Sequence, residues 1–560
     1  MNKNCLGPFK LWTIENFPFI EADFDAITNY QLYSKIVEFV KMIAENQDIL
    51  DNKIKYVIDY FENLDVQEEV NNKLDEMVED GTLTTLITPY IDTLTAAAQQ
   101  ATSAANQATS AANQATTNVN NLTNQVGTIV EKLRNKLSTQ YEYVNLPETM
   151  NAWFKNVQIL KAIDKNNYNY ALNIEKLKNS GGSTIYVDCN NANTGDGTEA
   201  NPYNNFKTAL TNSNNNDTII VKKGLYYRQN LNNTSSQDWK NVNVICDEGT
   251  LFTTGEALTW TQNSTYNNVY QSNRTNVANV IDLRNWERGI LSQLEKKSTL
   301  QACSQKVGSY YTDNTIIYVN LGEPVNNNNI LCSIKLGYRP FNMIASSQNL
   351  HLYFKNATFI AGRDGIIRVS RSDSYTMEFI AENCKFLFSP VTSIDGVEFL
   401  GSKSILINCE ASYNGKDGFN YHAQESNPCY AIELNCTGQA NGLIDTDNHS
   451  YNGSTVHDGG QIVRVNCNYF DNNGGNITDI DSNTISVNYG CNCFDSQAET
   501  ENEFSSDFCC KYGNCKMYLY NCFAQGKSYY NIYADLTTNN VYVDNCKYIT
   551  TGGNGNINIL

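Results

Sequence analysis

The dipeptide Asn-Cys recurs at nearly even spacing through the second half of the 560-residue chain. Seven of these dipeptides form a series with steps of 25, 27, 31, 26, 29 and 24 residues: Asn383-Cys384, Asn408-Cys409, Asn435-Cys436, Asn466-Cys467, Asn492-Cys493, Asn521-Cys522 and Asn545-Cys546. Three strands of about 5 residues with three turns amount to roughly 21 to 30 residues, which is one coil of a parallel β-helix. The repeat therefore predicts a β-helix in which every coil places an Asn and a small thiol at the same point.

Asparagine and cysteine are both abundant, and the repeat indicates a structural role for each of them. Stacked Asn side chains hydrogen-bond along a ladder, while stacked Cys side chains act as compact apolar fillers. The 17 cysteines show no second CxxC-type pair and no neighbouring His at their crowded points, so we expect no metal ion and no cofactor. The first 25 residues lack the basic and apolar segments of a signal peptide, so we expect reduced cysteines in a protein assembled in a cytoplasm.

Residues 181–230 introduce the repeat region. They contain a β-rich run, a Gly/Asn/Asp turn, a short amphipathic helix around Phe206 to Leu210, and two further strand-like runs. This order resembles the N-terminal cap of right-handed parallel β-helices of the pectate-lyase-like type, where the short helix hides the first strand edges. The predicted fold class is therefore mainly β, a right-handed parallel β-helix over residues 181–560, with an ordinary α+β start as the alternative.

Two helical segments with heptad spacing precede this region. The apolar positions of the first step by four and three through Ile36, Val40, Ile43, Gln47, Leu50, Ile54, Val57, Phe61 and Leu64. The second seam passes from Ile87 through the repeated heptad QATSAAN (100–106 and 107–113) to Leu133. An Ala-only stripe buries too little area for a lone helix, and β-branched seam residues favour trimers. We therefore predict an α-helical, trimeric coiled-coil stalk over residues 24–138, with a single amphipathic helix on a globular core as the alternative.

The aromatic-Pro segment GPFKLWTIENFPFIEADFD and the later DGTL break resemble, in this order, the N-terminal module of tail-fibre, tail-spike and appendage proteins of bacteriophages that infect Gram-positive bacteria. The match covers roughly residues 7–95. The resemblance implies that the N-terminus docks on other tail or collar proteins of the virion. Four domains are predicted: a virion-anchoring segment (1–23), the stalk (24–138), a neck (139–180) and the β-helix head (181–560).

The charge balance narrows the classes of partner. Forty Lys and Arg residues against 59 Asp and Glu residues give a formal net charge of −19 and a pI near 4.7. This acidity disfavours nucleic acid and anionic membranes as partners, and no apolar window of about 18 residues exists for membrane insertion. The long stacked surface of a β-helix suits an extended glycan instead.

Three of the four His residues fall between 422 and 457, in the densest titratable cluster of the chain. His422 and His449 each lie 14 residues after the Asn of their repeat, so we expect them to stack on adjacent coils. Aromatic rings around such a cluster suit a sugar-binding face. The predicted catalytic residues are Asp417, Asp445, Asp447, His422 and His449. The predicted substrate-binding residues are Tyr413, Phe419, Tyr421, Tyr451, His457, Asp458, Asp479, Asp481, Arg363 and Arg368.

Two kinds of catalysis remain open at this cluster. Carboxylates on adjacent coils lie about 5 Å apart and those two coils apart lie ~10 Å apart, near the separations of retaining and inverting glycosidases. A hydrolase would use Asp417 with Asp445 or Asp447, whereas a lyase would use His422 or His449 as a base beside a uronate carboxylate. Arg363, Arg368 and Arg371 could bind an acidic sugar in either reaction. Against this, Asp-Gly pairs are also ordinary corner residues of β-helices.

The segment NGKDGFNYH with the later HDGG also resembles phage β-helix tail spikes. The sequence as a whole predicts a homotrimeric phage tail spike or appendage protein, a virion component assembled in the host cytoplasm, that attaches the virion to a bacterial cell-surface polysaccharide. The first alternative is a depolymerase, a glycoside hydrolase or lyase, that acts on that glycan. The second alternative is a purely structural fibre.

Overall fold

The computed structural model describes residues 83–144, 146, 150, 154, 156–163, 167–227, 239–334, 339–360, 366–389, 395–424, 427–442, 450–497 and 505–560, together with Lys55. The chain divides into two compact units, Met1–Glu142 and Tyr143–Leu560. Each unit is described by itself.

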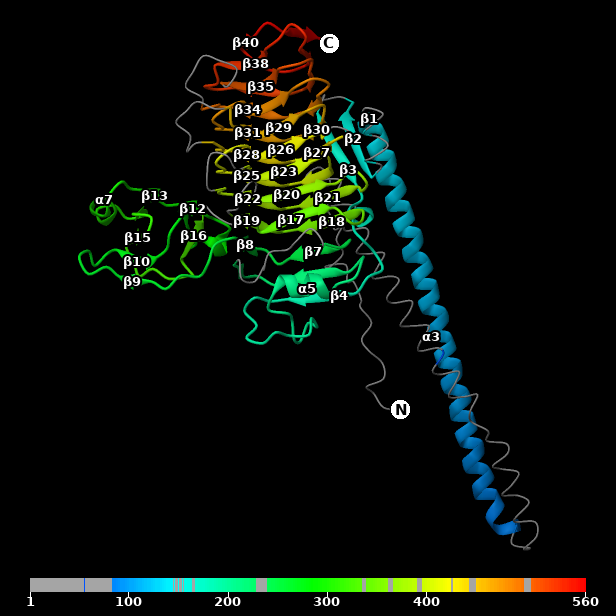
Figure 1. The fold of residues 1–560 in the computed structure, drawn as a ribbon. Helices are drawn as coiled ribbons and strands as arrows, with labels where there is room; N and C mark the ends of the chain where they lie inside the picture. The colour runs from blue at the N-terminus through cyan, green and yellow to red at the C-terminus, as the bar shows by residue number, and fades with distance from the viewer. Residues whose placement is uncertain are drawn as a thin grey trace. The chain divides into compact units, whose positions relative to one another are not determined.

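The described part of the first unit is one long helix, α3 (Leu83–Gln140), followed by the short strand β1 (Tyr141–Val144) (Figure 1). The predicted second seam is the less exposed stripe of this helix: Ala101, Ala105, Ala108, Ala112, Ala115, Val119, Leu122 and Val126 are half-buried and their described neighbours are exposed. The first heptad segment and the anchoring segment lie outside the described residues, and the coiled coil and the trimer stay predictions. No described helix combines the length and the apolar character that crossing a membrane requires.

The second unit is built from three parallel sheets, I, II and III, that the chain visits in turn on every coil (Figure 1). Sheet I consists of β4 (Thr184–Val187), β5 (Thr218–Val221), β7 (Asn243–Cys246), β18 (Leu350–Lys355), β21 (Met377–Glu382), β24 (Lys403–Ile407), β27 (Tyr430–Leu434), β30 (Gln461–Val465), β33 (Ile485–Tyr489), β36 (Lys516–Tyr520), β39 (Asn540–Asp544) and β41 (Asn556–Ile559). Sheet II consists of β6 (Leu225–Tyr226), β8 (Leu251–Thr253), β19 (Thr358–Ile360), β22 (Lys385–Leu387), β25 (Glu410–Ser412), β28 (Thr437–Gln439), β31 (Asn468–Phe470), β34 (Asn492–Phe494) and β37 (Phe523–Gln525). Sheet III consists of β17 (Phe341–Ala345), β20 (Ile367–Arg371), β23 (Val397–Leu400), β26 (Phe419–His422), β29 (Ser454–His457), β32 (Ile477–Ile480), β35 (Ser506–Lys511), β38 (Tyr530–Ala534) and β40 (Thr551–Gly552). The predicted parallel β-helix is confirmed.

The predicted cap helix is also present, as α5 (Phe206–Asn212). The Asn205 side chain caps it by accepting a hydrogen bond from the Thr208 amide. Phe206 is fully buried, and its ring packs against Phe252 and Phe341, whose centroids lie 5.6 and 4.9 Å away. The helix therefore closes the core at the first coils, as the sequence indicates.

The Asn of the repeat occupies the corner between sheets I and II, where the backbone turns in the left-handed region. Residues at this corner have φ between 49° and 61°; they are Asn356, Asn383, Asn408, Asn435, Asn466, Gly490, Asn521 and Asn545. Asparagine and glycine tolerate this conformation far better than other residues. The side chains also form the predicted ladder, since Asn408 donates to Asn383 over 3.2 Å and Asn435 donates to Asn408 over 3.3 Å.

One step of the predicted repeat is wrong. Asn492 does not lie at the corner; it begins β34 and pairs with Asn468 on β31. The corner of that coil is Gly490, and Cys491 takes the core position. The Asn-Cys dipeptide at 492–493 is two residues out of register, because glycine replaces asparagine where a positive φ is needed.

The thiols that follow the corners from Asn383 to Asn521 are buried. Cys384, Cys409, Cys436, Cys467, Cys491 and Cys522 belong to the core, and all 16 described cysteines are free thiols. Burial raises the pKa of the Cys467 thiol to about 12, so this side chain is neutral at physiological pH. Cysteine in this ladder is therefore a compact core residue, as predicted.

The segment that follows β1 packs along the outer face of sheet I. Its strands β2 (Val157–Ala162) and β3 (Tyr168–Leu172) form an antiparallel hairpin, followed by the 3-10 helix η3 (Ile174–Leu177). The Tyr168 ring stacks on Tyr489 with centroids 4.6 Å apart, and the Tyr168 carbonyl accepts a hydrogen bond from Asn466. Most of the predicted neck thus covers an apolar face of the β-helix, which is why Ile432 and Val463 are fully buried although they point outward from sheet I.

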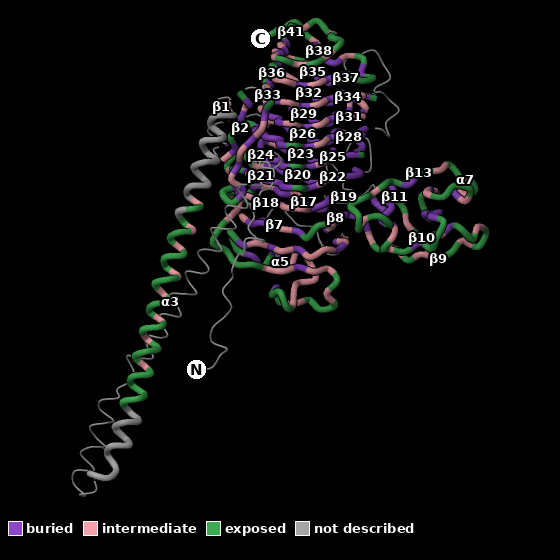
Figure 2. Tube along the Cα trace, turned by 180° about the vertical axis from the view of Figure 1, so that it is seen from behind, coloured by how far each residue is buried: buried purple, intermediate pink, exposed green. Residues whose placement is uncertain are grey.

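Between β8 and β17 the chain leaves the coils and forms an inserted, largely antiparallel subdomain with its own core. Its elements are β9 (Thr261–Gln262), β10 (Tyr270–Asn273), β11 (Val277–Asp282), η4 (Trp286–Arg288), β12 (Ser292–Gln293), β13 (Glu295–Lys296), α7 (Leu300–Ser304), β14 (Ser309–Thr312), β15 (Ile316–Asn320) and β16 (Ile330–Ile334). Figure 2 shows buried residues throughout the coils and a second group within the insert. The β-helix predicted over 181–560 therefore carries an insertion between β8 and β17 that the repeat does not predict.

Candidate functional site

The outer face of sheet III carries a block of four polar side chains on two neighbouring strands. β26 and β29 pair in parallel, with Asn420 opposite Thr455 and His422 opposite His457. Because side chains alternate between the two faces of a strand, the residues between them, Tyr421 and Val456, point into the core. The strand period therefore brings the four outer side chains together.

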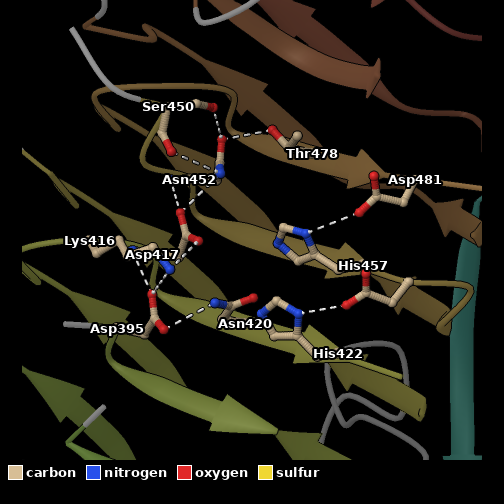
Figure 3. A network of polar contacts seen from close by, with 11 residues as sticks. Asp395, Lys416, Asp417, Asn420, His422, Ser450, Asn452, His457, Thr478 and Asp481 are labelled. Atoms are coloured by element: carbon tan, nitrogen blue, oxygen red, sulfur yellow. Dashed lines mark hydrogen bonds and ion pairs between the residues drawn. The ribbon is translucent and has the colours of Figure 1, made fainter. Parts of the chain in front are cut away.

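The two imidazole rings of this block stack on each other (Figure 3). Their centroids are 4.3 Å apart and their planes differ by 10°. Nδ1 of His422 lies 2.9 Å from an oxygen of Asp458, and Nδ1 of His457 lies 4.0 Å from an oxygen of Asp481. Both carboxylates come from the turns that follow β29 and β32, where Asp458 and Asp481 adopt positive φ.

Burial affects the ionisation of His457 and of Asp481. Burial, followed by the charges of His422, Lys416 and Lys511, lowers the pKa of His457 well below its usual value. His457 is therefore neutral at physiological pH, and its Nε2 atom is buried without a hydrogen-bond partner among the described residues. Burial and the neighbouring Asp458 raise the pKa of Asp481.

A second group of charges lies beside this block, where the chain enters β23 and β26. Lys416 Nζ lies 3.2 Å from Asp395 and 3.9 Å from Asp417. Asp417 Oδ1 accepts hydrogen bonds from the backbone and side-chain amides of Asn452, at 2.7 and 2.9 Å. Asp395 also accepts a hydrogen bond of 3.0 Å from Asn420, which links the lysine–carboxylate group to the His block (Figure 3).

Burial dominates the ionisation of this group. It raises the pKa of Asp417 to about 6, against the favourable charge of Lys416, and the nearby charge of Asp395 raises it further. Burial alone would disfavour the charged form of Lys416, but Asp395 and Asp417 outweigh it and raise the lysine pKa. Asp417 thus titrates in the range where a carboxyl group exchanges protons near neutral pH.

For several predicted site residues, the neighbour or the face of the sheet differs from the prediction. The residue opposite His422 on the next coil is His457, because the chain between β28 and β29 is longer than on the preceding coil while the turn from β29 to β30 is shorter. Phe419, Tyr421 and Asp479 are fully buried and point into the β-helix, so they do not contact a ligand on its surface. Predicted residues outside the described part of the chain are Arg363, Asp445, Asp447 and His449.

The other predicted binding residues lie in different surroundings. Tyr413 is 44% exposed and stacks on Phe388, at the far corner of sheet II. Arg368 binds Glu398 over 2.6 Å on the outer face of sheet III, in the row that continues to Asn420. Tyr451 is buried, and Arg371 donates to the Tyr375 carbonyl while burial lowers its pKa.

The sequence analysis did not include Asp395, Lys416, Asn420, Asn452 and Thr455 among the site residues. Asp395 belongs to the dipeptide Asp-Gly at 395–396, which repeats at Asp417-Gly418 one coil later. The equal spacing of these two dipeptides from β23 and β26 was the available signal, since each precedes its strand directly. Asn420 and Thr455 carry no such signal, because polar residues are common throughout the chain.

The interior behind sheet III contains a polar cluster that the sequence did not reveal. Arg464 is fully buried and donates to Ser454 and Asn488, and it lies 3.6 Å from Asp479. Burial raises the pKa of Glu433 to about 7, and this carboxyl group accepts hydrogen bonds from Ser454 and Tyr469. Glu433 also lies near Cys436 and Cys467 in the one metal-like grouping of His, Cys, Asp and Glu among the described residues, but its oxygens and both thiols already have hydrogen-bond partners.

Comparison with solved structures finds matches of low sequence identity. No protein-family model matches the chain, and no curated protein matches it. A structure described as a complex of XylC with xylose is 11% identical, over 67% of this chain and 70% of that chain, with a TM-score of 0.41. A glycoside hydrolase is 8% identical over 67% and 96%, with a TM-score of 0.36. The pectate lyase Pel9A is 14% identical over 65% and 81%, with a TM-score of 0.27.

Proposed function

We propose that the β-helix binds an extended bacterial surface polysaccharide along the outer face of sheet III. The observation that carries this proposal is the in-register pair of His422 and His457, which lies beside the buried Asn420 and Thr455 and is flanked by Lys416 and Asp458. Successive strands of a parallel sheet repeat about every 4.8 Å, so polar side chains on several strands meet successive parts of a linear polymer. Asp458 is exposed, and the half-buried side chains of Lys416 and His422 also reach the surface for such contacts.

The resemblance of the N-terminal sequence motifs supports a place for this chain in a phage tail. In this proposal the chain is a homotrimeric tail spike or appendage protein of a virion, and it attaches the virion to its host. The N-terminus docks on other tail or collar proteins, and neither nucleic acid nor membrane insertion takes part.

Cleavage of the bound glycan is the second candidate function, and the carboxyl pair Asp395 and Asp417 favours it. One oxygen of each contacts Lys416 Nζ, at 3.2 and 3.9 Å, so these oxygens lie no more than about 7 Å apart. That limit includes the separation of retaining glycosidases and the lower part of the inverting range. A carboxyl group with a pKa of about 6, such as Asp417, suits a general acid.

Binding and cleavage are separated by incubating the purified full chain with cell-wall and capsular polysaccharides from Gram-positive bacteria. Retention of the polysaccharide without new reducing or unsaturated ends supports attachment alone. Shortened chains that disappear in Asp417→Asn, with binding retained, support the depolymerase. Absence of both binding and cleavage across the panel would leave the structural fibre as the better account.

A further inference from the structure

The corner that follows sheet III presents a row of side chains beside the His pair. Asp458 follows β29, Asp481 follows β32 and Tyr512 follows β35, and all three have positive φ, of 58°, 72° and 56°. Successive coils repeat about every 4.8 Å along the β-helix, so Tyr512 lies two coils, or roughly 10 Å, beyond Asp458. The row therefore extends the outer face of sheet III past the coils that contain His422 and His457.

Tyr512 is the exposed aromatic residue of this row. It is 47% exposed. Lys511 Nζ lies over the ring, 5.6 Å from its centroid, and an ammonium group is attracted to an aromatic face at such a distance. Ile480, which is opposite Lys511 in the sheet and half-buried, adds an apolar side chain on the outer face. The polar row of Asp458 and Asp481 thus ends in an aromatic and apolar patch.

The backbone at Tyr512 has a conformation that a bulky residue rarely adopts. Its φ of 56° lies in the left-handed region. The other described residues with positive φ directly after a strand of sheet III are Gly401, Asp458, Asp481 and Gly553. Glycine and aspartate tolerate this region better than tyrosine does. Strained backbone is concentrated at functional positions, where a particular side chain is needed, so a tyrosine at this corner favours a role for its ring.

We propose that Tyr512 stacks against a sugar ring of the bound polysaccharide and forms an aromatic subsite that continues the face of His422 and His457. The subsite rests on the proposed glycan-binding function and gives it a second contact. A pyranose ring has an apolar face of C–H groups, and an exposed phenol ring covers that face while its hydroxyl stays in water. Tyr512 and His457 lie roughly 10 Å apart along the β-helix axis, so one monosaccharide does not contact both. The ligand is therefore a chain of several pyranose units that lies along this axis.

The test is equilibrium binding of the full chain to a panel of bacterial surface polysaccharides. Tyr512→Phe keeps the ring and should bind within about twofold of the wild type, whereas Tyr512→Asn should bind at least about tenfold more weakly. Asparagine suits the left-handed corner, so Tyr512→Asn should unfold at the temperature of the wild type or above it. Weaker binding by this variant then does not reflect unfolding. The control Tyr143→Asn removes a 67% exposed residue from β1 and should bind as the wild type does.

Nitration with tetranitromethane reports the contact directly. Saturating polysaccharide should slow the nitration of Tyr512 several-fold, as read by peptide mass spectrometry, and leave the nitration of Tyr143 unchanged. Equal binding by the wild type and the folded Tyr512→Asn, with weaker binding by His457→Ala, overturns the subsite and leaves the proposed function standing. Nitration of Tyr512 at an unchanged rate in the saturated complex overturns the subsite as well. A wild-type chain that retains no polysaccharide of the panel overturns both the proposed function and the subsite.

Discussion

His422 and His457 lie opposite each other on β26 and β29 with their rings stacked at 4.3 Å. The two coils differ in the length of the loop before the strand and of the turn after it, yet the strand register keeps the two side chains paired. The pairing of these two side chains is thus set by the ladder of the sheet and not by a fixed number of residues. This relationship decides where on the β-helix a ligand would bind.

The left-handed corner at Asn408 predicts a backbone effect that can be separated from the side-chain ladder. Asn408→Gly and Asn408→Val both lose the hydrogen bonds to Asn383 and Asn435. Both residues must adopt the φ of 51° found at this corner, which glycine does freely but which costs a residue with a β-carbon about 1 to 2 kcal/mol. Chemical unfolding should therefore show Asn408→Val less stable than Asn408→Gly by that amount. Equal stability of the two variants would show that this corner is not held in the left-handed region.

The core position of Cys467 predicts that serine destabilises the protein more than alanine does at this position. Cys467 is fully buried in the apolar core. Serine would place a hydroxyl there, at a cost of about 1 to 3 kcal/mol unless it finds a partner, while alanine loses only a small apolar group. We expect Cys467→Ser to lower the unfolding midpoint more than Cys467→Ala. A chain in which alanine is the more damaging substitution would indicate that the thiol has a role beyond packing.

The buried carboxyl groups predict that stability falls as the pH rises. Burial raises the pKa of Asp479 to about 6 and the pKa values of Glu433 and Asp507 to about 7. Such groups bind more protons in the folded than in the unfolded chain, so their contribution is complete below the unfolded pKa near 4 and is lost as the pH rises through 6 to 7. The free energy of unfolding should therefore be larger at pH 5 than at pH 8, by at least about 1.4 kcal/mol. A stability that is constant or increases over this interval contradicts the assignment.

The heptad pattern of α3 predicts an oligomer of defined size. The half-buried stripe from Ala101 to Val126 follows the predicted seam. Sedimentation equilibrium of the full chain should give three times the monomer mass of 62.8 kDa. Replacing Leu122 and Val126 by Asp should shift the mass toward the monomer while the β-sheet circular dichroism of the head persists. A monomeric wild-type chain would exclude the trimeric stalk.

Repetition explains how much of this fold could be read from the sequence. The Asn-Cys spacing predicts the coils, and Phe206 marks the cap helix, because both follow from one residue type at one recurrent position. The inserted subdomain follows no such period, so nothing in the spacing separates residues 254–334 from the coils on either side. Tyr168 and its hairpin contact residues some 300 positions later, at Asn466 and Tyr489, a relation that local patterns do not contain.

The candidate site could be predicted only in part, because counting residues along the chain does not give the register of the strands. The predicted His-rich region contains the polar block on β26 and β29, but counting residues from each Asn assumed equal loops and paired His422 with His449. Asp479 was assigned outward although its strand alternation points it inward beside Arg464. That Asn420 and Thr455 lie beside the His pair can be inferred only when the register of β26 and β29 is known.

Equilibrium binding of the full chain to purified bacterial surface polysaccharide tests the central claim most directly. The wild type and His351→Gln should bind equally, because His351 pairs with Glu378 away from sheet III. His457→Ala and Lys416→Ala, on the outer face of sheet III and the loop before it, should each weaken binding at least about tenfold, or ~1.4 kcal/mol. Undiminished binding by both folded variants would contradict the assignment of glycan recognition to this face.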